Sequence, residues 1–328
     1  MTIILEHPQA LINIEELPKQ KRKISVELLE PSLFVARFNI KTSYSIELIE
    51  SILKLKGVGY LCDEIARDEN QYYTKIPLKY LILGHVKPED LKNKRLLDFG
   101  CGCGASTVIL ARMFPDTEIV GIELNSKSLE LAKLRVKHYQ LDNVQFLLSP
   151  NSNRLPENIG KFDFILLNAV FEHFLPNERL TVLPQLWSLL NSQGIMFFRE
   201  TPHRYSPIEN HTTDLPLINY LPDSLALFCA RRFSKRIEPN ATWESLLRRG
   251  IRGGTEAEII NIIKEKSHEE PSLLEPNRLD LKDRIDLKYA GLSSLSLKSK
   301  IIKALLKTIK LLTGYTFVSW ISLAIKKP

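Results

Sequence analysis

The sequence predicts an α/β protein built on a doubly wound, mostly parallel sheet. Three observations predict it: short apolar runs recur from residue 95 onward, helical stretches separate them, and a glycine-rich turn follows the first run. Strands that alternate with helices indicate βαβ units, whose parallel strands are covered on both faces. The expected strands lie at 95–99, 118–123, 144–148, 162–169 and 194–200.

Changes of pattern divide the chain into four parts. In the first part, apolar residues recur about every 3.6 positions through SIELIESILKLKG, and Gly57 is a helix stop. In the third part, a proline-rich loop precedes helical segments at 222–233 and 255–266. The expected parts are an N-terminal helical cap (1–90), a cofactor-binding core (91–201), a substrate lid with the remainder of the core (202–290), and a basic amphipathic C-terminal helical extension (291–328).

Composition narrows the class of protein. The chain has 328 residues, of which 44% are hydrophobic and 25% charged, as in globular proteins. Its four cysteines include no C-x-x-C pair, which argues against a disulfide scaffold or a zinc ribbon and for reduced thiols. The start of the chain lacks the basic segment of a signal peptide, and no charge-free apolar run is long enough to span a bilayer. We therefore expect a cytoplasmic protein.

The segment LLDFGCGCGAST carries the sharpest signal. Gly100, Gly102 and Gly104 let the backbone approach a ligand closely, and the helix that follows presents free N–H groups. Asp98 ends the preceding strand, where a carboxylate would repel a pyrophosphate but tolerate a cationic ligand. Glu123 ends the next strand and can accept hydrogen bonds from two ribose hydroxyls. Together these residues favour a positively charged nucleoside without phosphate.

From about residue 80 to 201 the sequence resembles the class I S-adenosylmethionine-dependent methyltransferases, and within them the small-molecule and quinone-biosynthesis branches. The resemblance implies a Rossmann-like fold and S-adenosylmethionine as cofactor, with Asp98 and the three glycines around its amino-acid part, Glu123 on the ribose and Leu124 against the adenine. Where the family often has an acidic residue for the adenine amino group, this chain reads LSPNSN, so Asn151 or the backbone is expected there. Asn168 and Ala169 are expected to face the cofactor.

Polar residues after the fourth and fifth expected strands are the candidates for catalysis. Glu172 and His173 follow the fourth strand, and Glu200, His203 and His211 follow the fifth. A histidine is the natural base for removing a hydroxyl proton, because its reference pKa is near neutrality. For His173 an orienting role is the preferred interpretation, whereas for His203 and His211 both roles stay open. No metal-binding constellation is apparent, and Cys101 and Cys103 are interpreted as small packed residues.

The last part of the chain carries the basic charge. Residues 201–328 contain 21 Lys/Arg and 14 Asp/Glu, a net charge of +7. The net charge of the whole chain is also +7, so the rest of the chain is neutral overall. Along 295–312 the residues Lys300, Lys303, Lys307 and Lys310 share one arc of a helix, opposite an isoleucine- and leucine-rich arc. Two interpretations stay open: residues 295–325 lie on an anionic membrane surface, so that the protein is peripheral on the inner membrane face, or the helix packs on the core with solvated lysines.

The sequence thus predicts a methyltransferase that methylates a hydroxyl of a small-molecule, sugar or lipid-linked acceptor. One alternative is an RNA methyltransferase, although the basic helix lacks the interleaved aromatic residues that stack on bases, which argues against nucleic acid. Another is a non-catalytic cofactor-binding subunit, and a third is a dehydrogenase that uses the same loop. The sequence does not indicate an oligomeric state.

Overall fold

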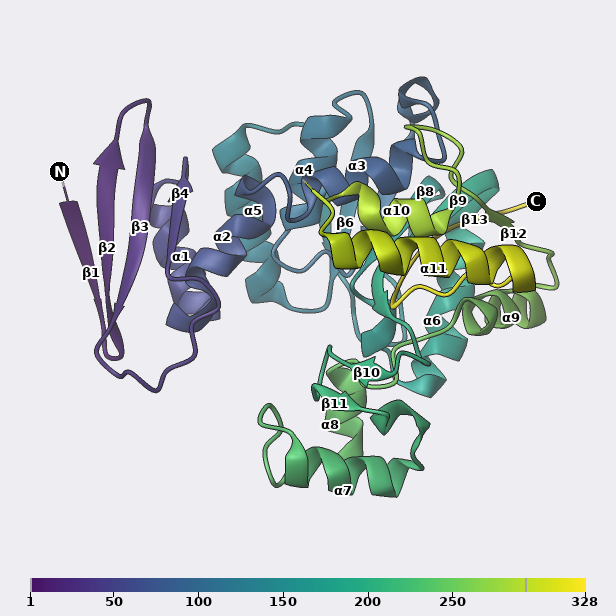
Figure 1. Ribbon diagram of the computed structural model, residues 1–328. Coiled ribbons are helices and arrows are strands. Elements are labelled where there is room, and N and C mark those ends of the chain that lie inside the picture. Colours follow the sequence, from purple (N-terminus) through teal and green to yellow (C-terminus); the bar gives the residue numbers. More distant parts are fainter. Residues whose placement is uncertain (1, 293) are drawn as a thin grey trace.

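A seven-stranded sheet forms the centre of the computed structural model, which describes residues 2–292 and 294–328 (Figure 1). Its strand order is β12-β13-β9-β8-β5-β6-β7; the strands from β9 to β7 run parallel, and β13 and β12 are antiparallel additions. The strands are β5 (Arg95–Phe99), β6 (Glu118–Glu123), β7 (Val144–Leu148), β8 (Phe162–Asn168), β9 (Leu190–Pro202), β12 (Ser272–Leu274) and β13 (Trp320–Lys326). The predicted fold class is confirmed, and each expected strand is present.

Helices cover both faces of this sheet because successive side chains of a strand point to opposite faces. Leu97 and Ile165 pack with helices α6 and α9 on one face, whereas Leu96 and Phe164 pack with α3 and α4 on the other. The bounds of these helices are α3 (Lys75–Leu83), α4 (Ala105–Met113), α6 (Pro176–Leu189) and α9 (Glu256–Ser267). Helix α5 (Ser126–Tyr139) packs beside α4 and β7.

The first part of the chain corrects the expected helical cap. A four-stranded antiparallel sheet precedes the helices and stands apart from the central sheet (Figure 1). In the segment ALINIEEL apolar and polar residues alternate, a period of two that fits a strand with one buried face; Ile12 and Ile14 are buried against the helices that follow. The elements are β1 (Thr2–His7), β2 (Ala10–Leu17), β3 (Lys21–Leu28), β4 (Asn39–Thr42), α1 (Ile46–Lys56) and α2 (Leu61–Glu69), with short 3-10 turns at 58–60 and 88–91. The helical prediction is correct only from α1 onward, where Gly57 ends that helix with φ +71°.

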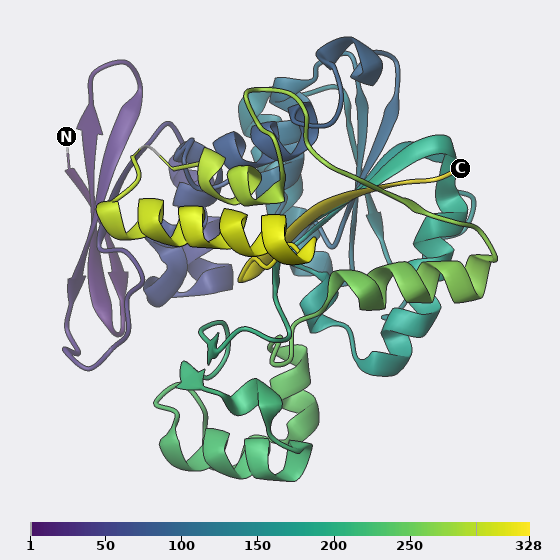
Figure 2. The same ribbon diagram turned by 45° about the vertical axis from the view of Figure 1, so that its right-hand side comes forward.

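Residues between β9 and α9 form a small lobe with its own apolar core (Figure 2). This lobe contains the predicted helix at 222–233, and its core includes Ile218, Ala226 and Leu246. Its elements are β10 (Ile208–Glu209), β11 (Leu215–Pro216), a 3-10 turn (Ile218–Tyr220), α7 (Asp223–Phe233) and α8 (Trp243–Arg248). The second predicted helix of this region is α9, which covers the central sheet instead.

The end of the chain corrects the expected C-terminal extension. Helix α11 (Leu297–Thr313) is present as predicted and follows α10 (Arg284–Ala290). Strand β13, however, inserts between β12 and β9, and its residues Ile321, Leu323 and Ile325 are buried in the main core. The run WISLAIK is apolar enough to be covered on both faces, as a central strand requires. In the described residues, no helix combines the length and the apolar character needed to cross a membrane.

A pair of leucine substitutions tests the placement of β13. Leu323→Ala is expected to lower the free energy of unfolding by about 2–5 kcal/mol, because it leaves a cavity in the core. Leu312→Ala removes a side chain that is 78% exposed and is expected to change it by less than about 0.5 kcal/mol. Urea unfolding followed by circular dichroism measures both. Equal effects of the two substitutions would contradict the insertion of β13 into the sheet.

Candidate active site

The glycine-rich loop connects β5 to α4 at the carboxyl edge of the sheet. Gly100, Gly102 and Gly104 all have positive φ, a conformation that favours glycine. At Gly104 an added Cβ would lie 2.7 Å from Ala132 Cβ, so the loop is packed against α5. At Gly102 an added Cβ would meet no atom within 4 Å. The loop is therefore anchored on one side and open to a ligand on the other.

Asp98 holds the start of α4 onto the end of β5. Its Oδ2 accepts hydrogen bonds from Ser106 Oγ at 2.7 Å and Thr107 Oγ1 at 2.6 Å. Burial raises the pKa of the Asp98 carboxyl to about 6. Its Oδ1 is buried and accepts no hydrogen bond from the described chain. Asp98 thus has both a structural role and one acceptor atom left for a donor.

Glu123 ties the end of β6 to the same loop. Its carboxylate accepts the backbone N–H of Gly102 at 2.9 Å, of Leu124 at 2.7 Å and of Asn125 at 3.0 Å. These three donors hold the carboxylate at the carboxyl edge of the sheet, beside the open side of the loop. An anionic acceptor fixed in this way suits a ligand with neighbouring hydroxyl groups.

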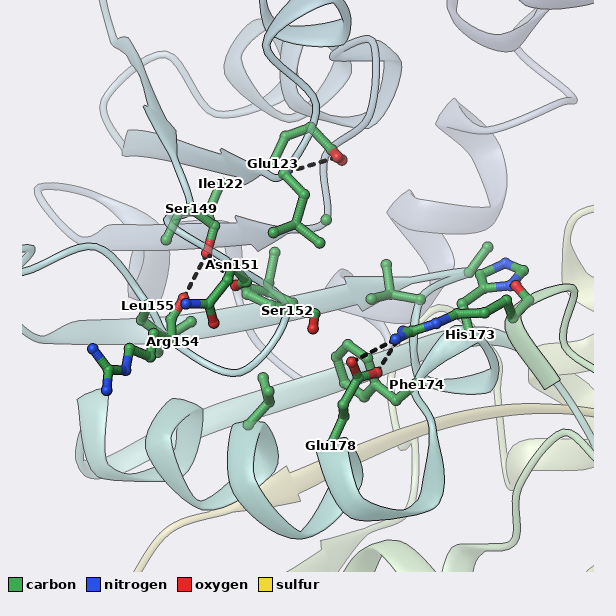
Figure 3. A pocket seen from close by; sticks show the side chains of 17 residues that line it. Ile122, Glu123, Ser149, Asn151, Ser152, Arg154, Leu155, His173, Phe174 and Glu178 are labelled. Carbon is green, nitrogen blue, oxygen red and sulfur yellow. Dashed lines mark hydrogen bonds and ion pairs between the residues drawn. The ribbon is translucent and has the colours of Figure 1, made fainter. Parts of the chain in front are cut away.

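A cavity of about 340 Å³ lies against this loop, within the usual size of small-molecule sites (Figure 3). Of the residues predicted to bind the cofactor, Gly100, Glu123, Leu124 and Asn151 line this first cavity. Glu123 and Glu178 lie on opposite sides of it. Much of the remaining lining is apolar and comes from Phe99, Ile122, Leu155, Val170, Phe174 and Val182.

The other predicted cofactor residues do not line the first cavity. Asp98, Gly102 and Gly104 shape the loop, and Asn168 Oδ1 accepts a hydrogen bond from Arg199 Nη1 at 2.7 Å. The next residue along the chain, Ala169, lines the first cavity instead and has a left-handed backbone with φ +55°. Of the pair Asn168 and Ala169 that the sequence analysis expected to face the cofactor, only Ala169 lines this cavity.

A second cavity, of about 590 Å³, shares Ala169 with the first. Distant parts of the chain build it: the segment 67–81, the end of β9, the small lobe, α10 and β13. Its polar and aromatic lining consists of Arg67, Tyr72, Tyr73, Arg199, Glu200, His211, Lys288, Tyr289, Trp320 and Ser322. Only Glu200 and His211 of these were predicted, because the others belong to segments that tertiary folding brings to the site.

The charges in the second cavity are unequally compensated. Arg199 is nearly buried and its Nη2 lies 2.5 Å from Glu200 Oε1, so these two charges form an ion pair. Lys288 Nζ donates a hydrogen bond to Ser319 Oγ at 2.8 Å. Within the described residues no carboxylate lies at ion-pair distance from Lys288, and burial lowers its pKa. The cavity therefore offers a cation without a partner.

The three candidate histidines lie in different places. His211 lines the second cavity and His173 the first, with their ring centroids 5.6 Å apart. Burial lowers the pKa of both imidazoles, so both are largely neutral at pH 7. His203 lines neither cavity; it is buried, and its Nδ1 accepts the backbone N–H of Tyr205 at 3.1 Å.

Glu172 lies directly behind the two cavity histidines. Its Oε2 accepts a hydrogen bond from Thr201 Oγ1 at 3.1 Å, while its Oε1 is buried without a hydrogen-bond partner in the described chain. Burial raises the pKa of this carboxyl to about 8. The ligand atoms of Glu172, His173 and His211 lie within 4.8 Å of one another, a donor set of the kind that transition metals accept. The sequence analysis did not anticipate this cluster, because its members come from two separate segments.

A buried guanidinium joins the glycine-rich loop to the N-terminal part. Arg135 of α5 donates to the backbone oxygen of Cys103 at 2.6 Å, to Glu64 Oε1 at 3.0 Å and to Tyr44 Oη at 3.0 Å. On the sequence this arginine belongs to a charged helix and gives no sign of burial. Cys101 and Cys103 are buried free thiols.

Comparison with known proteins agrees with this geometry. The family described as "Methyltransferase domain" matches residues 90–236. An uncharacterized protein of Rickettsia prowazekii is 30% identical over 112 residues, which cover 34% of this chain and 44% of that protein. Demethylmenaquinone methyltransferase of Lactococcus lactis is 28% identical over 150 residues, covering 45% of this chain and 56% of that enzyme.

Among solved structures, that of PKMT2 from Rickettsia typhi aligns with a TM-score of 0.46 and 18% identity over 77% of this chain and 52% of that chain. The present chain spans about half the length of the curated relatives that it matches. The parallel sheet, the D-x-G-x-G-x-G turn and the family match agree with one another. The match over residues 90–236 supports a class I S-adenosylmethionine-dependent methyltransferase domain in this part of the chain.

Proposed function

We propose that the chain transfers a methyl group from S-adenosylmethionine, held in the first cavity, to a hydroxyl of an acceptor held in the second. The observation that carries this proposal is the meeting of the two cavities at Ala169, at the carboxyl end of β8. Methyl transfer needs donor and acceptor in contact and in line, which adjoining cavities permit. The acceptor is a small molecule, a sugar or a lipid-linked compound.

Several features of the first cavity and of the glycine-rich loop beside it fit the cofactor. The open side of Gly102 and the free Asp98 Oδ1 would receive its amino-acid part, and the Glu123 carboxylate would accept the ribose hydroxyls. Leu124 and Asn151, which line the cavity, would border the adenine. When bound, the cofactor supplies an electrophilic methyl group on a sulfonium. The chain itself contributes shape, hydrogen bonds and the exclusion of water.

The second cavity indicates the chemistry of the acceptor. Tyr72, Tyr73 and Trp320 supply flat apolar surface, which favours a ring or an extended apolar group. The uncompensated charge of Lys288 favours an anionic group on the acceptor. The partly matching demethylmenaquinone methyltransferase supports an apolar ring compound by analogy.

His211 is the base in this proposal. It lines the second cavity, where the acceptor is held in this proposal, and burial lowers the pKa of its imidazole, which keeps the ring neutral. The neutral ring can take the proton of the acceptor hydroxyl while the new O–C bond forms and the C–S bond of the cofactor breaks. The ion pair with Arg199 holds the Glu200 carboxylate, which suits Glu200 for orienting the acceptor. His173 faces the first cavity, and its Nδ1 lies 2.9 Å from the backbone oxygen of Arg248, which suits it for positioning.

The acceptor class is tested with the purified protein, methyl-labelled S-adenosylmethionine and a lysate of the source cell. Label is expected in an organic-extractable or small aqueous compound that binds an anion-exchange resin, because the acceptor cavity is aromatic and cationic. Label in RNA would favour the alternative of an RNA methyltransferase. Cofactor binding without transfer of label to any fraction would favour a non-catalytic subunit.

Glu123→Ala tests the cofactor site. The loss of a carboxylate that accepts two ribose hydroxyls is expected to weaken S-adenosylmethionine binding by about a hundredfold. The matched control is Glu118→Ala, at the opposite end of the same strand, where the acid pairs with Arg95 on the surface. Isothermal titration calorimetry measures both affinities. Unchanged affinity in Glu123→Ala would remove the ribose contact from the proposal.

His211→Asn tests the base. For the intact protein kcat/KM is expected to rise with pH as His211 loses its proton, with the midpoint of the rise below the ordinary pKa of 6.5, because burial lowers that pKa. His211→Asn is expected to remove this rise and to lower kcat by about a hundredfold or more, with cofactor affinity unchanged. His268→Asn is the control, since His268 ends α9 in a left-handed conformation that asparagine tolerates. A normal pH profile in His211→Asn would assign the base elsewhere.

A further inference from the structure

Helix α11 is oriented with its charged face inward and its apolar face outward. Lys303 Nζ lies 2.8 Å from Asp286 Oδ1, Lys307 Nζ lies 2.7 Å from the same atom, and Lys310 Nζ lies 3.5 Å from Glu275 Oε1. Burial would raise the pKa of the Asp286 carboxyl, but the hydrogen bonds from the two lysines outweigh it and lower that pKa. The ion pairs therefore fix the rotation of α11 about its axis.

The apolar face of α11 is left uncovered. No residue of this helix is buried, and Leu305, Leu311 and Leu312 are 58%, 86% and 78% exposed. Leu297 and Ile301 belong to the same exposed face. Both views place α11 on the outside of the molecule, beside α10 (Figure 2). Large aliphatic side chains gathered on one exposed face mark a surface that meets another apolar phase.

The charges that remain free on α11 are positive. Lys298 and Lys300 are exposed, and neither lies at ion-pair distance from a carboxylate of the described chain. No acidic residue follows Asp286 in the sequence. A partner of this face therefore meets aliphatic side chains together with uncompensated cations.

We propose that α11 docks on an anionic lipid surface, with its leucine and isoleucine face in the acyl boundary and with Lys298 and Lys300 at the headgroups. A wide aliphatic arc on a helix with lysines and no acid is the pattern of an interfacial helix. This corrects the sequence expectation, in which Lys303, Lys307 and Lys310 met the headgroups together with Lys300, and residues as far as 325 took part. The inward lysines are used within the protein, and β13 is buried in the sheet.

The composition of the face favours lipid over a second copy of the chain. Protein interfaces are enriched in aromatic residues and arginine and depleted in lysine. The exposed arc of α11 instead consists of leucine and isoleucine side chains together with Ala304, Thr308, Lys298 and Lys300, and it contains no aromatic residue and no arginine. It is the convex surface of a single helix, which suits a fluid lipid phase.

Docking would also place the acceptor cavity next to the membrane. Leu287 and Lys288 of α10 line that cavity, and α10 also carries Asp286, which pairs with Lys303 and Lys307 of α11. Leu292, half-exposed between the two helices, belongs to the same lining. If the proposed function holds, this arrangement suits an acceptor with an apolar tail, but the docking itself does not depend on the reaction.

Co-sedimentation with vesicles tests the docking on the full chain. The protein is expected to sediment with vesicles of phosphatidylcholine and phosphatidylglycerol, and more weakly with phosphatidylcholine alone. The double variant Leu305→Ser/Leu312→Ser is expected to reduce the partition coefficient by about tenfold for each leucine, because less apolar surface enters the lipid. Lys298→Gln/Lys300→Gln is expected to reduce it by about fivefold for each lysine, only with the anionic vesicles.

A matched control removes exposed apolar side chains elsewhere. Leu225→Ser/Phe228→Ser on α7 changes residues that are 45% and 59% exposed and is expected to leave vesicle binding unchanged. All these side chains are exposed, so thermal unfolding is expected to stay as in the parent chain. The proposal is overturned if the parent chain does not sediment with anionic vesicles, or if the leucine variant binds them equally well. It is also overturned if analytical ultracentrifugation finds a dimer that the leucine variant dissociates while vesicles bind neither form.

Discussion

The buried guanidinium of Arg135 is the interaction on which the arrangement of the site depends. A charged group that is buried away from solvent must be paired and fully hydrogen-bonded. Arg135 donates hydrogen bonds to Glu64, to Tyr44 and to the backbone oxygen of Cys103. These groups belong to the N-terminal part and to the glycine-rich loop. By satisfying one cation they fix the loop against α2, and thereby place Arg67 and the segment after it at the second cavity. Removing the guanidinium would leave the Glu64 carboxylate buried beside an unpaired carbonyl.

The carboxyl end of β8 decides how the two cavities communicate. Ala169 adopts a left-handed backbone there and presents only a methyl group, so neither cavity is blocked by a longer side chain. The neighbouring Asn168 is held by Arg199, which also binds Glu200. One arginine thus orders polar groups at the ends of two adjacent strands.

Electrostatics also determines which face of α11 meets the surroundings. An isolated amphipathic helix near a protein would bury its leucines and expose its lysines. Here α10 offers Asp283 and Asp286 on the side where α11 packs, and the ion pairs are partly shielded from water. The helix therefore turns its lysines inward. An amphipathic pattern alone specifies two faces but not which of them the protein covers.

The sequence by itself determined the central sheet, the cofactor loop and Glu123, because strand periodicity, glycine spacing and the position of an acid at a strand end are local signals. It also located helices α7, α9 and α11 to within one or two residues. Tertiary structure alone decided that β13 enters the sheet, that His211 and not His203 reaches the second cavity, and that Lys288 and Trp320 line the same cavity. Each of these outcomes depends on contacts with residues distant in the chain, and the residue pattern of one segment does not show which distant segment it will contact. The N-terminal sheet lies between these two cases. Its apolar residues recur with a period of two in the sequence, but only packing against α1 and α2 shows that the segment forms strands and not a helix.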